Sequence, residues 1–97
     1  MEKITQDSYK LYINGQWIDA SDGATFQTRC PANGEGLATC AQATREDVDQ
    51  AVDAAWAAFR SWKNVTTNER AAILNRIADI IDANAEHLAM IESLDNG

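Results

Sequence analysis

The chain has 97 residues, of which 45% are apolar and 24% charged, an ordinary balance for one small domain or for part of a larger one. Its 15 acidic residues against 8 basic ones give a net charge of −7, and it lacks the clusters of Lys and Arg that nucleic-acid binding requires. Residues 1–10 lack the apolar core of a secretory signal, and no apolar run approaches the roughly 18 residues needed to cross a bilayer. We therefore expect a cytoplasmic protein with neither nucleic acid nor a membrane as partner.

The first part of the chain, residues 9–43, is predicted to be rich in β-structure. Asn14-Gly15 is its clearest local signal, because both residues tolerate the positive φ of a two-residue type I′ turn and the flanking residues suit strands. The pattern predicts a β-hairpin, with Trp17 placed beyond the turn to clamp it or to meet a neighbour. Strands are expected at residues 9–13, 16–18, 25–29 and 37–41, with a loop over 31–36 that holds the only proline.

From Thr44 onward the chain contains no proline, and its only glycine is the last residue. Thr44 and Asp47 resemble a capping box, which predicts a helix over about residues 45–62. Negative charge is favourable near a helix N-terminus. We therefore expect a solvated acidic face on this helix, formed by Glu46, Asp47, Asp49 and Asp53.

Two more helices are expected in residues 44–97. Thr66 and Glu69 form the capping box of the second helix, and Asn84 starts the third. Apolar residues recur at steps of three and four, which is typical of one buried helix face. The residues expected to face a core or an interface are Val48, Val52, Ala55, Trp56, Phe59, Trp62, Ile73, Leu74, Ile77, Ile80, Ile81, Leu88, Ile91 and Leu94. The sequence thus predicts an α+β segment, with a β-hairpin and short strands followed by three amphipathic helices.

Candidate catalytic residues are few. His87 is the only histidine, and no spacing places it beside a nucleophile, so we expect a surface residue. For Cys30 and Cys40, the favoured interpretation is two reduced, buried or half-buried thiols, and the alternative is a redox or nucleophilic role. Residues 33–36 hold two glycines without the spacing of a phosphate-binding loop. The residues alone therefore predict no catalytic and no cofactor-binding side chain.

Six motifs in order resemble the N-terminus of the aldehyde dehydrogenase superfamily. They are "YINGQWIDASDG", "PANGEGLA", "DVDQAVDAA", "AFRSW", "ERAAILNRIAD" and "LDNG", and the likeness runs without a gap from about Tyr9 to Gly97. One departure is Cys30, where the family usually has Asn before the proline. The resemblance implies that residues 1–97 are the N-terminal part of one dehydrogenase domain, within an α/β, Rossmann-like coenzyme-binding domain.

The resemblance also implies a parent activity, the NAD- or NADP-dependent oxidation of an aldehyde to a carboxylate. The family's catalytic cysteine, general-base glutamate and nucleotide-binding loops lie downstream of the matched region. The chain alone is therefore expected to be a non-catalytic scaffold that binds neither NAD nor NADP. Two alternatives stay open, which are a stand-alone interaction module that docks on a full-length homologue and a truncated product without activity.

A structural monovalent cation and a docking partner are implied in the same way. The family's cation ligands match the backbone carbonyls of Thr28 and Arg29 and the carboxylate of Asp95, and oxygen ligands suit a hard cation. The alternative is that Asp95 only supports the end of its helix. In the family the three helices lay their apolar faces on the coenzyme-binding domain, and the hairpin lies near subunit contacts. The expected partner is therefore the rest of a dehydrogenase chain or, without it, a second copy.

Overall fold

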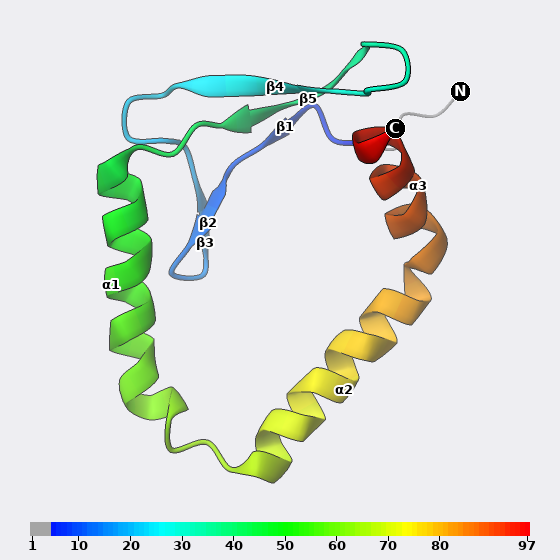
Figure 1. Ribbon diagram of the computed structural model, residues 1–97. Coiled ribbons are helices and arrows are strands. Elements are labelled where there is room, and N and C mark those ends of the chain that lie inside the picture. The colour runs from blue at the N-terminus through cyan, green and yellow to red at the C-terminus, as the bar shows by residue number, and fades with distance from the viewer. Residues whose placement is uncertain (1–4) are drawn as a thin grey trace.

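The computed structural model describes residues 5–97, and it confirms an α+β segment with short strands followed by three helices. The elements in chain order are β1 (Ser8–Tyr9), β2 (Leu11–Ile13), β3 (Gln16–Ile18), β4 (Thr25–Arg29), β5 (Gly36–Ala41), α1 (Arg45–Trp62), α2 (Thr67–Ala83) and α3 (Ala85–Asn96). They form an open frame in which the strands lie along one side, α1 descends one flank, and α2 and α3 return along the other (Figure 1).

The strands form two separate sheets. Strand β5 is the centre of a three-stranded sheet, where it pairs parallel with β1 and antiparallel with β4. Strands β2 and β3 form the predicted hairpin, whose turn residues Asn14 and Gly15 have φ values of 53° and 75°, as a type I′ turn requires. The expectation of one strand over 9–13 is wrong. The run breaks at Lys10, because its first part pairs with β5 and its second part pairs with β3.

Both predicted capping boxes are confirmed. At the start of α1, the Thr44 hydroxyl accepts from the Asp47 amide at 3.2 Å, and the Asp47 carboxylate accepts from the Thr44 amide at 2.9 Å. At the start of α2, Thr66 and Glu69 exchange the same two bonds at 3.2 and 3.1 Å. These bonds satisfy amides that have no partner inside the helix, which is why the two helices begin where the sequence predicts.

Asn84 lies between α2 and α3. It is the N-cap residue of α3, as predicted, because its carbonyl accepts from the Leu88 amide at 2.9 Å. Its side chain makes no capping bond to α3 and instead donates from Nδ2 to the Ile80 carbonyl at 2.8 Å, so the same residue also closes α2. The third helix nevertheless follows directly at Ala85.

The core of the described residues is very small. Only Ala20, Cys30, Ala38 and Asp47 are buried. The helices do not pack along one another, and the expectation of inward-facing residues on α3 is confirmed only in part: Ile91 and Leu94 are half-buried, whereas Leu88 is 44% exposed. The apolar faces of the helices exist as predicted, but most of their large side chains remain exposed within residues 5–97. Over the same residues, no helix is long and apolar enough to cross a membrane.

Candidate functional site

The apolar face of α1 is the most prominent surface feature. Trp56 is 65% exposed, although its ring meets Phe59 edge-on at a centroid distance of 5.9 Å. The pattern of steps of three and four places these rings on one side of the helix with further exposed side chains, namely Val48, Val52 and Trp62. The hairpin borders one part of α1, but these side chains remain about half exposed or more, and such a face is suited to docking.

A second apolar face runs along α2 and α3. Leu74 is 66% exposed. The other large apolar residues exposed on these two helices are Ile77, Ile80, Ile81, Leu88 and Met90. The spacing of three and four positions puts Leu74, Ile77 and Ile81 on one side of α2, and exposed apolar patches on soluble proteins mark interaction sites. We call these exposed apolar residues of α1, α2 and α3 the docking faces.

The hairpin carries an aromatic pair. Tyr12 and Trp17 lie opposite each other in the β2–β3 register, with ring centroids 4.7 Å apart and ring planes inclined by 48°. Trp17 thus contacts Tyr12 across the hairpin, as the clamp interpretation predicts, and remains 65% exposed, so both predicted roles stay open. Small residues of α1 border the hairpin, because Ala51, Ala54, Ala55 and Ala58 line a recess with Tyr12, Ile13 and the turn.

Asp47 contradicts the expectation of a solvated acidic face. It is 2% exposed, the most buried side chain among the described residues. Besides its capping bonds, its two carboxylate oxygens accept from the Ser21 amide at 3.1 and 3.2 Å, across 26 residues of sequence. The backbone amides of Thr44 and Ser21 lower the pKa of the Asp47 carboxyl below its ordinary value of 3.8. The carboxylate thereby ties the loop after β3 to the start of α1, and Ser21 adds a 2.8 Å hydroxyl contact to Thr44.

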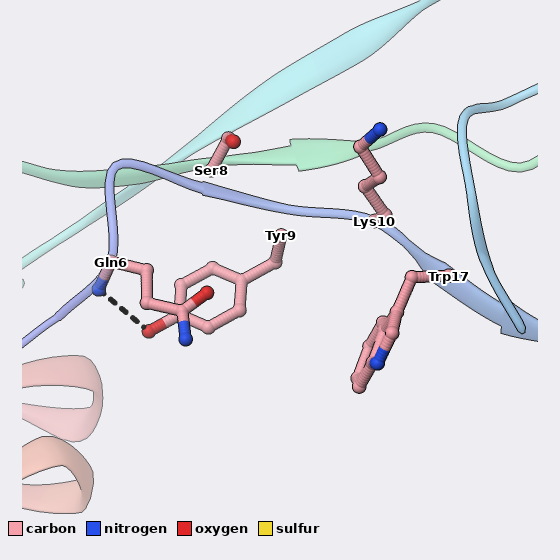
Figure 2. A pocket seen from close by; sticks show the side chains of 5 residues that line it. All are labelled: Gln6, Ser8, Tyr9, Lys10 and Trp17. Atoms are coloured by element: carbon pink, nitrogen blue, oxygen red, sulfur yellow. Dashed lines mark hydrogen bonds between the residues drawn. The ribbon is translucent and has the colours of Figure 1, made fainter.

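A recess of about 360 Å³ lies between β1 and the hairpin, lined by Gln6, Ser8, Tyr9, Lys10 and Trp17 (Figure 2). The Tyr9 hydroxyl accepts from the backbone amide of Gln6 at 3.0 Å, and the rings of Tyr9 and Trp17 project to the same side of the chain (Figure 2). The lining holds no carboxylate, thiol or imidazole. It can make contacts with an apolar group, but it has no acid–base pair for catalysis.

The predicted candidates for chemistry are not brought together. His87 is exposed near the start of α3, beside Asn84, Glu86 and Met90. Cys30 and Cys40 are free thiols, the first buried and the second half-buried, as the favoured interpretation predicted. Within residues 5–97, no three His, Cys, Asp or Glu side chains gather closely enough to hold a metal ion.

The residues predicted for a monovalent cation lie at the ends of two elements, with Thr28 and Arg29 at the end of β4 and Asp95 near the end of α3. Thr28 and Arg29 end the edge strand β4, where a bulge interrupts the pairing with β5, and the Arg29 guanidinium donates to the Gly34 carbonyl at 3.1 Å. Gly97 lies so close to Pro31 that an added Cβ would be 2.8 Å from the proline ring. This contact joins the C-terminal end of α3, which contains Asp95, to the segment that follows Arg29. The candidate ligands, two backbone carbonyls and one carboxylate, all offer oxygen atoms, which hard cations prefer.

Arg70 is a residue that the sequence analysis did not single out. It lies in the first turn of α2, and its Nη2 atom donates to two carbonyl oxygens at the end of α1, those of Trp62 at 3.1 Å and Lys63 at 3.3 Å. The guanidinium carbon is 5.5 Å from the centroid of the Trp62 ring. The sequence signal that could have revealed it is an arginine in the first turn after a short helix–helix connection.

Comparisons with known proteins agree on one family. The family model described as "Aldehyde dehydrogenase family" matches residues 17–97 of this chain. Among curated relatives, aldehyde dehydrogenase family 2 member C4 of Arabidopsis thaliana is 50% identical over 90 residues, which are 91% of this chain and 18% of the relative. Acetaldehyde dehydrogenase 2 of Cupriavidus necator is 44% identical over 92 residues, covering 95% of this chain and 18% of the relative.

Solved structures show the same likeness in three dimensions. An NAD+ complex of aldehyde dehydrogenase from Bacillus cereus superposes with a TM-score of 0.86 at 43% identity, over 91% of this chain and 18% of that one. An NAD-dependent aldehyde dehydrogenase from Sinorhizobium meliloti gives a TM-score of 0.87 at 35% identity, over 93% and 18% of the two chains. The chain therefore spans about a fifth of the length of the relatives that it matches.

Proposed function

The chain belongs to the aldehyde dehydrogenase family, and on that basis we propose that it serves as the N-terminal scaffold of an NAD- or NADP-dependent enzyme that oxidises an aldehyde to a carboxylate. Residues 1–97 form, in this proposal, the first part of one dehydrogenase domain, with a β-rich part over 9–43 and three helices over 44–97. The chain contributes no catalytic residue and no contact to the nicotinamide cofactor.

The docking faces are the observation that carries the proposal. Their large apolar residues lie on three well-formed helices, two of which begin with complete capping boxes, yet these side chains remain about half exposed or more within residues 5–97. Burial of such residues is the main favourable term in protein association. The partner is the remainder of a dehydrogenase chain, and a second copy of this chain can cover the faces when that remainder is absent.

A chimeric enzyme tests the proposal. The 97 residues would replace the matching segment of the Bacillus cereus enzyme, to which they are 43% identical. We expect a folded chimera that reduces NAD in the presence of an aldehyde, whereas the chain alone yields no NADH. A matched control carries the segment of the Sinorhizobium meliloti enzyme. If that control is active and the chimera is insoluble or inactive, the chain is not a dehydrogenase scaffold.

The alternative of a module that docks on a full-length homologue has less support. The relatives are whole dehydrogenases that each contain a segment similar to this chain, so a full-length homologue already occupies the surface on which such a module would dock. In a pull-down, the scaffold proposal expects this chain to bind a dehydrogenase that lacks the segment more tightly than the intact enzyme. Equal capture of both would favour the module.

We propose further that the carbonyls of Thr28 and Arg29 and the carboxylate of Asp95 hold a monovalent cation. The contact of Gly97 with Pro31 supports it, because it brings the end of α3 to the end of β4. In the chimera, replacing K⁺ and Na⁺ by choline should lower the unfolding midpoint, and Asp95→Asn should abolish that difference. Equal midpoints in all three salts would refute the site.

The expected cytoplasmic location stays a prediction, since curated relatives include mitochondrial enzymes. Fractionation of cells that express the natural gene would test it, and recovery of the protein in an organelle would contradict it.

A further inference from the structure

The connection between α1 and α2 is a sharp corner at the far end of the frame from the strands (Figure 1). It is short, because α1 ends at Trp62 and Thr66 already caps α2. The two helices diverge from it without packing along their lengths, so hydrophobic contact does not set the angle between them. Something local must set it if the docking faces are to keep one arrangement.

The corner is densely hydrogen-bonded for an exposed segment. The amides of Lys63, Asn64 and Val65 donate to carbonyls of Phe59, Ser61 and Trp62 at 3.0–3.1 Å. The Asn64 side chain reaches the Arg60 carbonyl at 3.4 Å. Each of these bonds joins residues only three or four positions apart. They therefore shape the end of α1 but do not connect it to α2.

Arg70 makes the connection. Its guanidinium donates to the Trp62 and Lys63 carbonyls, which are among the C-terminal groups of α1 that have no partner inside the helix. A cation is also favoured at this end of a helix dipole. The same group lies over the Trp62 ring at 5.5 Å, a distance at which cation and ring attract. A planar fork can donate and stack at once, which an ammonium group cannot do.

We propose that Arg70 is a positioning residue that fixes the angle between α1 and α2, so that the docking faces of the two helices are held in a preset arrangement before a partner covers them. Pre-organisation of this kind lowers the entropy lost on association. Its benefit for docking rests on the proposed function, whereas the corner itself is a property of this chain alone. The two ideas can therefore fail separately.

The experiment measures the angle in the 97-residue chain. Spin labels are placed at exposed Asp53 on α1 and Asp79 on α2, in a background with Cys30→Ala and Cys40→Ala, and the distance between them is read by pulsed electron paramagnetic resonance. We expect one narrow distance peak in the parent, a broad and shifted distribution in Arg70→Met, and an intermediate width in Arg70→Lys. Far-UV circular dichroism checks that the helices remain formed.

The matched control is Arg76→Met, on the same helix. Within residues 5–97, the Arg76 side chain makes no hydrogen bond, ion pair or ring contact, so the control should keep the narrow parent peak. The proposal is overturned if Arg70→Met gives the same distribution as Arg76→Met. It is also overturned if the parent peak is as broad as that of the chain in guanidinium chloride, because the corner would then hold no angle. Either result leaves the chimera test of the dehydrogenase scaffold unaffected.

Discussion

Replacing Trp56 by alanine should weaken the docked state and leave the free chain almost unchanged. In the chain alone the side chain is 65% exposed, and among residues 5–97 its one ring contact is with Phe59. Losing an edge-on ring pair costs about 0.5–1.5 kcal/mol. Alanine returns about 0.5 kcal/mol of helix propensity at an exposed position. The two terms nearly cancel, so the helix content of the free chain should stay within error of the parent.

The docked state has much more to lose. A tryptophan side chain can bury up to ~250 Å², so the exposed 65% of Trp56 amounts to roughly 160 Å² that a partner could cover. At about 25 cal/mol per Å², that area corresponds to about 4 kcal/mol. Alanine keeps a part of it and the partner surface relaxes, so we expect a loss of about 3 kcal/mol. This equals a fall of roughly 150-fold in the ratio of folded to unfolded chimera.

Urea titration of the chimeric enzyme is the appropriate assay, with Gln50→Ala as the control on the same helix. Gln50 is exposed and lies outside the docking faces, so its replacement should shift the midpoint very little. The reasoning is refuted if Trp56→Ala and Gln50→Ala give the same midpoint in the chimera. It is equally refuted if Trp56→Ala unfolds the free chain, since the residue would then belong to an internal core.

Three more substitutions test local features in the chain alone. Asp47→Asn should speed hydrogen exchange of the Ser21 amide. Because the folded pKa of Asp47 lies below 3.8, the stability it contributes is present above that pH and is lost as the pH falls through the folded pKa. The gap between parent and variant should therefore narrow in acid, and a gap that stays constant from neutral pH into acid would contradict the assignment. Thr66→Ala should lower the free energy of unfolding by about 1 kcal/mol in thermal melts followed by circular dichroism at 222 nm. Glu69→Gln keeps the capping box and should cost only about a few tenths of a kcal/mol, and equal losses in the two variants would contradict the role of the Thr66 cap. Gly15→Ala should destabilise the hairpin by about 1–2 kcal/mol, because a φ of 75° is unfavourable for alanine although the added Cβ would meet no atom, and Gly15→Asn should cost less. Near-UV circular dichroism of the Tyr12–Trp17 pair measures both variants, and an alanine variant as stable as the parent would contradict the turn assignment.

The features that the sequence predicted correctly are local ones. The bounds of α1, both capping boxes and the type I′ turn each depend on residues within four positions of one another. Their geometry follows from backbone preferences that act before any tertiary contact forms. The family resemblance was also accessible, because its motifs occur in order along nearly the whole chain.

The features that were missed depend on residues far apart or on surfaces outside the chain. Asp47 was read as solvated because its partner, the Ser21 amide, is 26 residues away. The run over 9–13 was read as one strand because nothing in it indicates that β1 joins a sheet with β5. No pattern in the sequence distinguishes Arg70 from other surface arginines, because its contact with Trp62 depends on the angle between α1 and α2. The helix faces were recognised as apolar, but the periodicity carries no information on whether the covering surface lies in the same chain.

The small core has a consequence for how changes in this segment would be observed in a cell. Four buried residues provide little burial to offset the entropy of ordering the described chain. Under the proposed function, its margin of stability comes mainly from the rest of the dehydrogenase. In a continuous dehydrogenase, the covalent link sets a high effective concentration of that body. A substitution on the docking faces would then lower the amount of enzyme that survives quality control, and the surviving molecules would turn over aldehyde at the normal rate. Reduced abundance with an unchanged turnover number is the phenotype that distinguishes this scaffold from a catalytic element.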